Sequence, residues 1–417
     1  MQYKTYDDFP KVQLPLDTDH ISICDSTIRH ASRMPGIIIQ KQNKIDIYNY
    51  IHKIGLEAAE VYLYSDVDRE TVKEIHNLGY EYPTLIGWVL PKKEEIDLAL
   101  QTENISEISL AMPVSDTQMN TILKMNRDKA IDYYLSLIDY AHDHNLKVRC
   151  LLQDITRANI KKVVKPLVKE ILKRDPLNNI RIIDLMGLGI PFLDSDLPYS
   201  IPSLVKSFKE WGVQNIEIHS HDDFGLSFVN TLSALWYGAN WASMTFLGLG
   251  DRAGTAAFEP LLLFLNFRAK GSKDKYHIEY VTEFAEYMER ELDVVLPGNK
   301  AAVGKNIFSH ESGIHTAGVA KNPFIYEPYP PELVGGTRKL IVGDSSGTDV
   351  IRIKVEEILK NTLNIDAKID KKDSRIVSIY KEIHHLYDVE GRRSAISDEE
   401  LKNYVEKYFV YEQDGAH

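Results

Sequence analysis

Two histidines stand two residues apart at the end of an apolar run. Val213 to Ile218 predicts a β-strand, and His219 and His221 continue it. Because the side chains of a strand alternate between its two faces, both imidazoles point the same way and can reach one metal ion. A pair of surface histidines at a strand end is the alternative, since so short a motif recurs by chance.

Polar residues also follow the other predicted strands. Arg29 and His30 come soon after the apolar run His20 to Cys24. The remaining strand ends carry Glu60, Ser115, Asp116, Gln153, Asp154, Asp184, Asp251 and Arg252. Single members have simpler explanations, such as a helix N-cap for Ser115 or an ion pair for Arg252. Their shared position favours one functional site.

The elements that position these residues alternate regularly. Apolar runs begin near residues 21, 58, 83, 105, 147, 180, 213 and 241. Amphipathic helical patterns between them cover 40–54, 68–78, 92–100, 127–142, 160–173, 201–212 and 226–238. This α/β pattern predicts a (β/α)8 TIM barrel, whose site lies at the carboxyl ends of the strands. A doubly wound open sheet is the alternative, but no Gly-rich dinucleotide loop follows the first strand.

The chain after the barrel is predicted to be mainly helical. Helical periods cover 276–292, 349–363, 374–387 and 398–409, whereas 326–331 is too rich in proline for a helix. We therefore predict an N-terminal lead-in (1–19), a barrel domain (20–272) and a C-terminal accessory region (273–417).

Composition excludes several classes of protein. A net charge of −12 argues against a nucleic-acid-binding surface. Cys24 and Cys150 each lie in an apolar run, which indicates buried thiols and a reducing compartment. The sequence shows no signal peptide and no run long enough to span a membrane. We expect a soluble cytoplasmic protein.

Four motifs resemble those of the DRE-TIM metallolyase superfamily. Asp25 to Arg29 is similar to D-x-T-L-R, His219 to Gly225 to H-x-H-N-D-x-G, Gly248 to Gly254 to G-x-G-E-R-x-G, and Phe308 to His315 to F-x-H-E-S-G-I-H. The resemblance covers about residues 20 to 350. It is to the Claisen-condensing branch, which includes 2-isopropylmalate, homocitrate, citramalate and Re-citrate synthases.

The resemblance implies a metal-dependent acyltransferase that condenses acetyl-CoA with a 2-oxo acid in amino-acid or carboxylic acid biosynthesis. It implies a divalent metal cofactor and a homodimer. Arg29 corresponds to the group that stabilises the enolate oxygen, and Glu60 to the family acid near the metal. His219 and His221 correspond to the metal-binding histidines.

The resemblance also implies a shared site. His310 and Tyr326 correspond to an accessory-domain pair that reaches into the barrel of the partner subunit and helps to move protons. Candidate substrate-binding residues are Ser115, Gln153, Arg157 and Leu185.

The sequence departs from the family pattern at four positions. His30 replaces a metal-binding carboxylate, and Thr255 replaces an asparagine near the metal. Gln153 stands where an acid is usual, and Leu185 where a threonine commonly holds the substrate carboxylate. In one interpretation, His30 joins the two histidines in a site that suits manganese, cobalt, zinc or iron better than magnesium.

The four departures also allow other interpretations of the function. The metal site has decayed in one of them, leaving a non-catalytic paralogue or one with a changed reaction. A lyase or aldolase running the reverse cleavage is another. Leu185 to Pro191 resembles the Re-citrate synthase branch more than the isopropylmalate branch, but the sequence does not identify the 2-oxo acid.

Overall fold

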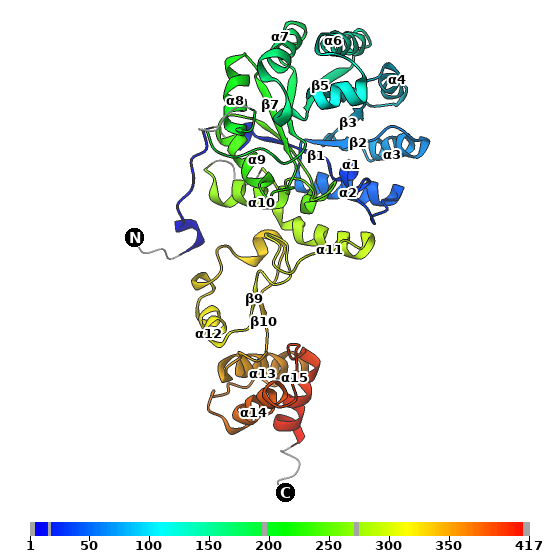
Figure 1. Cartoon of the computed structure of the whole chain (residues 1–417). Helices are drawn as coiled ribbons and strands as arrows, with labels where there is room; N and C mark the ends of the chain where they lie inside the picture. The colour runs from blue at the N-terminus through cyan, green and yellow to red at the C-terminus, as the bar shows by residue number, and fades with distance from the viewer. Residues whose placement is uncertain (1–4, 16–17, 194–197, 271–274, 412–417) are drawn as a thin grey trace. The chain divides into compact units, whose positions relative to one another are not determined.

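The chain divides into two compact units (Figure 1). The computed structural model describes residues 5–15, 18–193, 198–270 and 275–411. Pro10–Leu296 forms the barrel unit, and Met1–Phe9 together with Pro297–His417 forms the accessory unit. The boundary predicted between residues 272 and 273 lies outside the described residues.

Eight parallel strands close into a barrel. They are β1 (Ser22–Asp25), β2 (Ala58–Val61), β3 (Thr84–Val89), β4 (Glu107–Pro113), β5 (Lys147–Gln153), β6 (Asn179–Asp184), β7 (Asn215–Ser220) and β8 (Trp241–Met244). Each strand pairs with the next along the chain, and β1 pairs with β8 through Cys24 and Ser243, which closes the sheet. The prediction of an α/β (β/α)8 barrel is confirmed.

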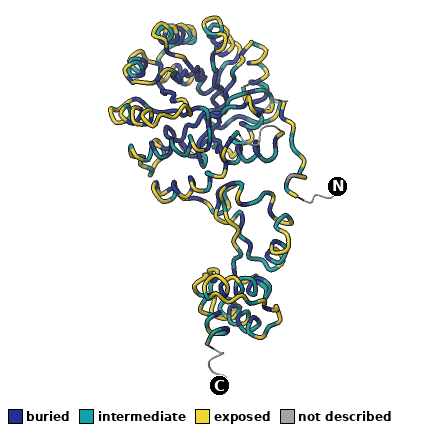
Figure 2. Tube along the Cα trace, turned by 180° about the vertical axis from the view of Figure 1, so that it is seen from behind, coloured by how far each residue is buried: buried dark blue, intermediate teal, exposed yellow. Residues whose placement is uncertain are grey.

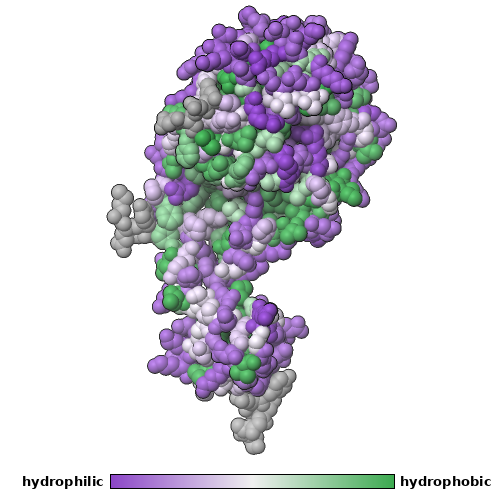
Figure 3. Space-filling view, in the orientation of Figure 1, coloured by the Kyte–Doolittle hydropathy of each residue, from purple (hydrophilic) through white to green (hydrophobic). Residues whose placement is uncertain are grey.

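Helices surround the strands in Figure 1. They are α2 (Lys41–Ile54), α3 (Asp66–Asn77), α4 (Lys93–Gln101), α6 (Arg127–Asp143), α7 (Lys165–Arg174), α8 (Ile201–Glu210), α9 (Ser227–Trp236), α10 (Phe258–Leu263) and α11 (Val281–Leu292). In α2, Ile47, Ile51 and Ile54 follow helical spacing and are fully buried. Figure 2 shows buried strands inside helices with exposed outer faces, and Figure 3 shows a largely hydrophilic surface over α6 and α7. The apolar face of α2 therefore packs into the core of the barrel unit.

The accessory unit contains a second core. Its elements are β9 (Ser309–His310), α12 (Gly313–Lys321), β10 (Lys339–Leu340), α13 (Thr348–Leu363), α14 (Ser374–Asp388) and α15 (Asp398–Val405). Val355, Ile379 and Leu401 from its last three helices pack in one hydrophobic cluster. The predicted helices 349–363 and 374–387 are confirmed almost to the residue. Among the described residues of both units, no helix has the length and apolar character needed to cross a membrane.

Candidate active site

The turn after β1 is held by its own side chains. Asp25 accepts a hydrogen bond from the backbone N of Thr27 at 2.9 Å, and its second oxygen accepts one from the Thr27 hydroxyl. The Thr27 hydroxyl oxygen in turn accepts a bond from the backbone N of Phe246 at 2.7 Å, just beyond β8. The short helix α1 (Thr27–Ala31) begins there and carries Arg29 and His30. Asp25 and Thr27 thus fix the turn rather than face a substrate.

Arg29 is fixed by two side-chain contacts. Its Nε donates to Glu60 Oε2 at 2.9 Å, and its Nη2 donates to His30 Nε2 at 2.6 Å. The guanidinium also lies 5.4 Å from the centre of the Trp88 ring. The cation is therefore preorganised at the barrel mouth.

Glu60 is an ionised anchor. It is fully buried and accepts hydrogen bonds from Ser26 Oγ at 3.0 Å and Ser109 Oγ at 2.5 Å, while Arg181 Nη1 lies 2.7 Å from its Oε1. Burial by itself raises the pKa of Glu60, but the Arg181 and Arg29 charges outweigh it and hold the pKa well below its ordinary value. Glu60 therefore orients Arg29 and is unsuited to exchanging protons at neutral pH.

His30, His219 and His221 come together at the mouth. The ring centre of His30 lies 4.9 Å from that of His219 and 5.8 Å from that of His221, and the last two are 5.2 Å apart. The Nδ1 of His219 lies 3.1 Å from the Ser243 carbonyl oxygen, to which it donates as the neutral tautomer. This leaves the lone pair of His219 on Nε2, as a metal ligand requires.

All three imidazoles are neutral at pH 7. Burial, followed by the Arg29 charge, lowers the pKa of His30 well below its ordinary value. Burial has the same effect on His219, and burial with the Arg252 charge lowers the pKa of His221 to about 4. A neutral imidazole is the form that binds a metal.

The donor set fits a metal only in part. Among the described residues, no group of three or more His, Cys, Asp or Glu side chains has metal-binding geometry. The lone pair of His30 Nε2 accepts from Arg29, and its Nδ1 lies on the side of Gly250, where a Cβ would stand 3.4 Å away. His219 and His221 fit a divalent metal better. The Nδ1 of His219 donates to the Ser243 carbonyl oxygen, and the buried Nδ1 of His221, like that of His30, has no hydrogen-bond partner. A third bond from His30 requires that Arg29 release it.

A hollow with a cavity volume of about 40 Å³ opens between these groups. Its polar lining is Arg29, His30, Arg33, Gln153, His219, His221 and Asp251. Its apolar lining, which we call the apolar arc, is Trp88, Ala111, Leu151, Ile183 and Leu185. Gln153 and Leu185, predicted to bind substrate, therefore face the same space as the histidines.

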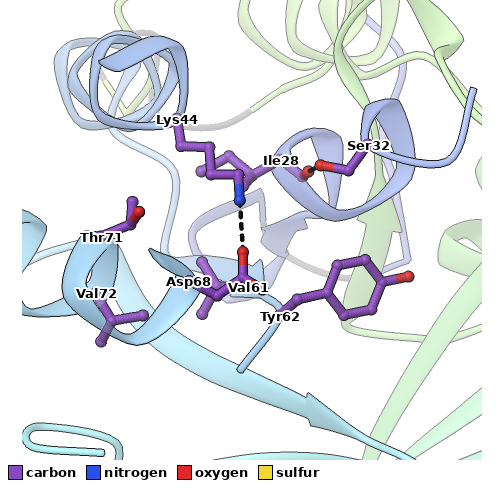
Figure 4. A pocket seen from close by; sticks show the side chains of 8 residues that line it. All are labelled: Ile28, Ser32, Lys44, Val61, Tyr62, Asp68, Thr71 and Val72. Atoms are coloured by element: carbon purple, nitrogen blue, oxygen red, sulfur yellow. Dashed lines mark hydrogen bonds and ion pairs between the residues drawn. The ribbon is translucent and has the colours of Figure 1, made fainter. Parts of the chain in front are cut away.

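A smaller hollow lies between α1, α2 and α3 (Figure 4). Lys44 points into it from α2 and forms an ion pair with Asp68 of α3 at 2.5 Å. Thr71 and Val72 close the other side. Because its charges already pair with each other, this hollow is structural.

Ser115 and Arg157 contact Asp154 instead of the mouth hollow. Ser115 Oγ donates to Asp154 Oδ2 at 2.5 Å, and Arg157 Nε donates to both carboxylate oxygens at 2.8 and 3.0 Å. Neither residue lines the hollow. Their role in substrate binding remains a prediction, and the structure shows them bracing the loop after β5.

The accessory unit holds the other two predicted residues. His310 Nε2 lies 3.2 Å from Glu327 Oε1, and Arg338 donates to both oxygens of Glu327 at 2.6 Å. The Tyr326 ring is partly exposed and lies 4.2 Å from the His315 ring. His310 is thus oriented by a carboxylate, as a proton-transfer histidine is.

Arg181 and Trp88 are site residues that the sequence reasoning missed. Arg181 stands within the apolar run of β6, and a charged residue inside a buried strand is itself a signal of an internal partner. Trp88 lies inside β3 and has no polar signature. Only the closed barrel shows that it faces Arg29.

Fold and site together define a barrel enzyme family. A family model described as HMGL-like matches residues 20–288, and one described as homocitrate synthase post-HMGL domain-like matches residues 302–390. The chain belongs to the HMGL-like family.

Three curated relatives match most of the chain. The citrate (Re)-synthase of Clostridium kluyveri is 31% identical over 96% of this chain and 92% of its own length. The 2-isopropylmalate synthase of Methanocaldococcus jannaschii is 30% identical over 93% and 71%. The homocitrate synthase AksA of Methanothermobacter thermautotrophicus is 29% identical over 81% and 84%. The chain is thus about equally similar to synthases with different names.

Solved structures of HMG-CoA lyases share the fold. The Bacillus subtilis protein has a TM-score of 0.56 at 18% identity and covers 69% of this chain and 97% of its own. The Pseudomonas aeruginosa protein has a TM-score of 0.56 at 14% identity, covering 68% and 96%. At these identities the likeness concerns the barrel alone.

Proposed function

We propose that this chain is an acyltransferase that condenses acetyl-CoA with a 2-oxo acid. The methyl carbon of the acetyl group loses a proton and bonds to the keto carbon, and water then releases the thiol of CoA. The product is a 2-hydroxy acid with one more carboxylate. The observation that carries the proposal is Arg29, fixed by Glu60 beside two neutral histidines in a small hollow.

Arg29 stabilises the negative charge that develops on the enolate oxygen. Glu60 binds its Nε and His30 its Nη2, and the guanidinium lines the hollow, where its charge is worth more than in water. His219 and His221 would hold a divalent metal, which would supply a Lewis acid for the keto group of the substrate. The Ser243 carbonyl keeps the His219 Nε2 lone pair available for it.

His310 is the proposed proton-transfer residue, supplied by a second copy of the chain. Glu327 orients its ring, and Arg338 keeps Glu327 in place. Tyr326 accompanies it from the same unit. The barrel unit exposes the large apolar side chains of Phe192, Phe224 and Trp236, residue types that subunit interfaces bury. These features support a homodimer.

A thiol-release assay tests the proposal. Acetyl-CoA is offered with pyruvate, 2-oxobutyrate, 2-oxoisovalerate, oxaloacetate and 2-oxoglutarate, each with magnesium, manganese, cobalt and zinc. We expect release with at least one acid, and its loss in Arg29→Ala but not in Arg174→Ala, a surface arginine paired with Asp139. Cleavage of a preformed hydroxy acid without any condensation would identify a lyase instead.

A further inference from the structure

The mouth hollow has two chemically different sides. The apolar arc comes from adjacent strands β3 to β6 and from Leu185 just after β6. Ala111 stands opposite Leu151 in the strand register, and Ile183 stands opposite Gln153. Trp88, Ala111, Leu151 and Ile183 also form one hydrophobic cluster, against which Leu185 packs. The arc is therefore a continuous apolar wall.

Two cations of the hollow, Arg29 and Arg33, lie at one end of this wall, over the ring of Trp88. Arg29 and Arg33 both come from the segment after β1. Arg33 lies 3.9 Å from Asp251 and over the rings of Tyr62 and Trp88, at 5.0 and 4.9 Å from their centres. Within the lining of the hollow, strands β3 to β6 contribute one polar side chain, the uncharged amide of Gln153.

We propose that the 2-oxo acid which this chain condenses carries an aliphatic side chain, and that the apolar arc binds it. The inference rests on the proposed function. The carboxylate and keto oxygen of the substrate face Arg29 and the histidines, so its side chain projects toward Leu151 and Leu185. Transfer of an aliphatic group from water to this wall is favourable.

A second carboxylate beside Leu151 and Leu185 loses its hydration, and Arg252, which donates to the Leu185 carbonyl oxygen, is already paired with Asp223. An unpaired buried charge is strongly unfavourable, because one amide replaces only a small part of its hydration. Leu185 stands where the family commonly has a threonine hydroxyl, which extends the apolar wall to the rim. The three relatives are synthases with different names and are 29 to 31% identical to this chain. Sequence identity therefore does not decide between an aliphatic and a dicarboxylic 2-oxo acid.

The test uses pairs of acids with equal carbon count. 2-Oxobutyrate is compared with oxaloacetate, and 2-oxopentanoate with 2-oxoglutarate, each pair differing by a terminal methyl or carboxylate. We expect kcat/KM for thiol release to favour the aliphatic acid by at least about 100-fold, the size of effect that an uncompensated buried charge produces. Calorimetric titration of each acid without acetyl-CoA gives the same order independently of turnover.

Substitution of Leu185, at the rim of the hollow, provides a second test. Leu185→Arg places a cation beside the arc and is expected to lower the aliphatic preference at least tenfold. Leu185→Met keeps the volume and the preference. Leu177→Arg, an exposed leucine before β6, controls for the added charge.

The outcomes separate the two proposals. Thiol release with oxaloacetate or 2-oxoglutarate equal to that with the aliphatic twin overturns the inference and leaves the proposed function standing. Calorimetric preference for the aliphatic acid without thiol release supports the apolar subsite and contradicts the condensation. No binding and no release with any acid contradict both. A preference unchanged in Leu185→Arg places the side chain elsewhere and also overturns the inference.

Discussion

Arg181 Nη1 lies 2.7 Å from Glu60 Oε1 inside the barrel, and both side chains are fully buried. Arg181 Nη2 donates to Glu217 Oε1 at 3.0 Å, and Glu217 lies 3.5 Å from Arg149. Glu60 also binds Arg29 at the mouth. Charges therefore alternate from Arg29 into the barrel, and each buried ion has a partner of opposite sign.

Replacing Arg181 should destabilise the barrel, and it should also lower activity, because Glu60 would orient Arg29 less firmly. Arg181→Met leaves Glu60 and Glu217 short of a cation, which costs about 3–5 kcal/mol for a broken buried pair. Arg181→Lys keeps the charge and should recover part of the loss. Urea denaturation gives the stability, and kcat should fall more than KM rises in the folded fraction. Arg174→Met, which breaks a surface pair, should cost about 0–1 kcal/mol.

Stability should depend on pH through Glu60. Its native pKa lies well below the ordinary value of 4.5, because Arg181 and Arg29 outweigh the effect of burial. The unfolded chain therefore binds a proton below about pH 4.5 while the native chain does not, so stability falls as pH falls. This stabilisation is fully present above pH 4.5. The slope for one group is up to about 1.4 kcal/mol per pH unit.

Glu60→Gln provides the comparison. The variant is less stable at pH 7, since two arginines lose their anion. Its deficit relative to the wild type should shrink as pH falls from 4.5 toward 3. A deficit that stays constant over this range would show that Glu60 carries no depressed pKa.

The barrel could be predicted because the period of the apolar residues shows where the strands and helices lie. Alternating apolar runs and helical stripes locate the eight strands within a few residues, and closure follows from their number. Arg29, His219 and His221 could be placed at one mouth for the same reason. The sequence also indicated buried thiols, and Cys24 and Cys150 are both buried and free.

The partners of each site residue could not be predicted, since spacing does not show which atoms meet across a barrel. Ser115 follows β4 and Arg157 follows β5, yet both contact Asp154. His30 follows Arg29 in sequence, and its ring accepts from that arginine. Side-chain direction after a strand end depends on the loop, for which no periodic pattern exists.

Metal content should follow the histidines. We expect about one equivalent of a transition metal in protein purified without chelator, and its loss in His219→Ala and His221→Ala. His142→Ala, a half-buried histidine in the last turn of α6, should keep it. Elemental analysis decides the matter, and less than about a tenth of an equivalent after reconstitution contradicts metal binding.

Arg29 should compete with the metal for His30. Because Arg29 donates to His30 Nε2, Arg29→Ala frees that lone pair and should tighten cobalt or zinc binding by about tenfold. Adding His30→Ala to Arg29→Ala should remove the gain. Equal affinities in the wild type and both variants would exclude His30 as a third ligand.

Cys24 and Cys150 should not react with the reagent that detects the thiol of free CoA. Burial raises the pKa of Cys24 and Cys150, so little thiolate forms and no reagent reaches it. With an aromatic disulfide reagent at pH 8, the native protein should show much less than one reactive thiol, and the urea-unfolded chain two. A rapid reaction in the native state would indicate an opening of the barrel.

Activity should be restored between two inactive variants if two copies share a site. Arg29→Ala damages the barrel mouth and His310→Ala the accessory unit, so a mixed dimer retains one intact pair of units. Random mixing of equal amounts should recover about a quarter of wild-type activity, because half of the dimers are mixed and each has one working site. Arg29→Ala mixed with His219→Ala is the control, since both changes lie in the barrel unit. If His310 instead serves the barrel of its own chain, the mixed dimers hold no complete site, and neither mixture recovers activity.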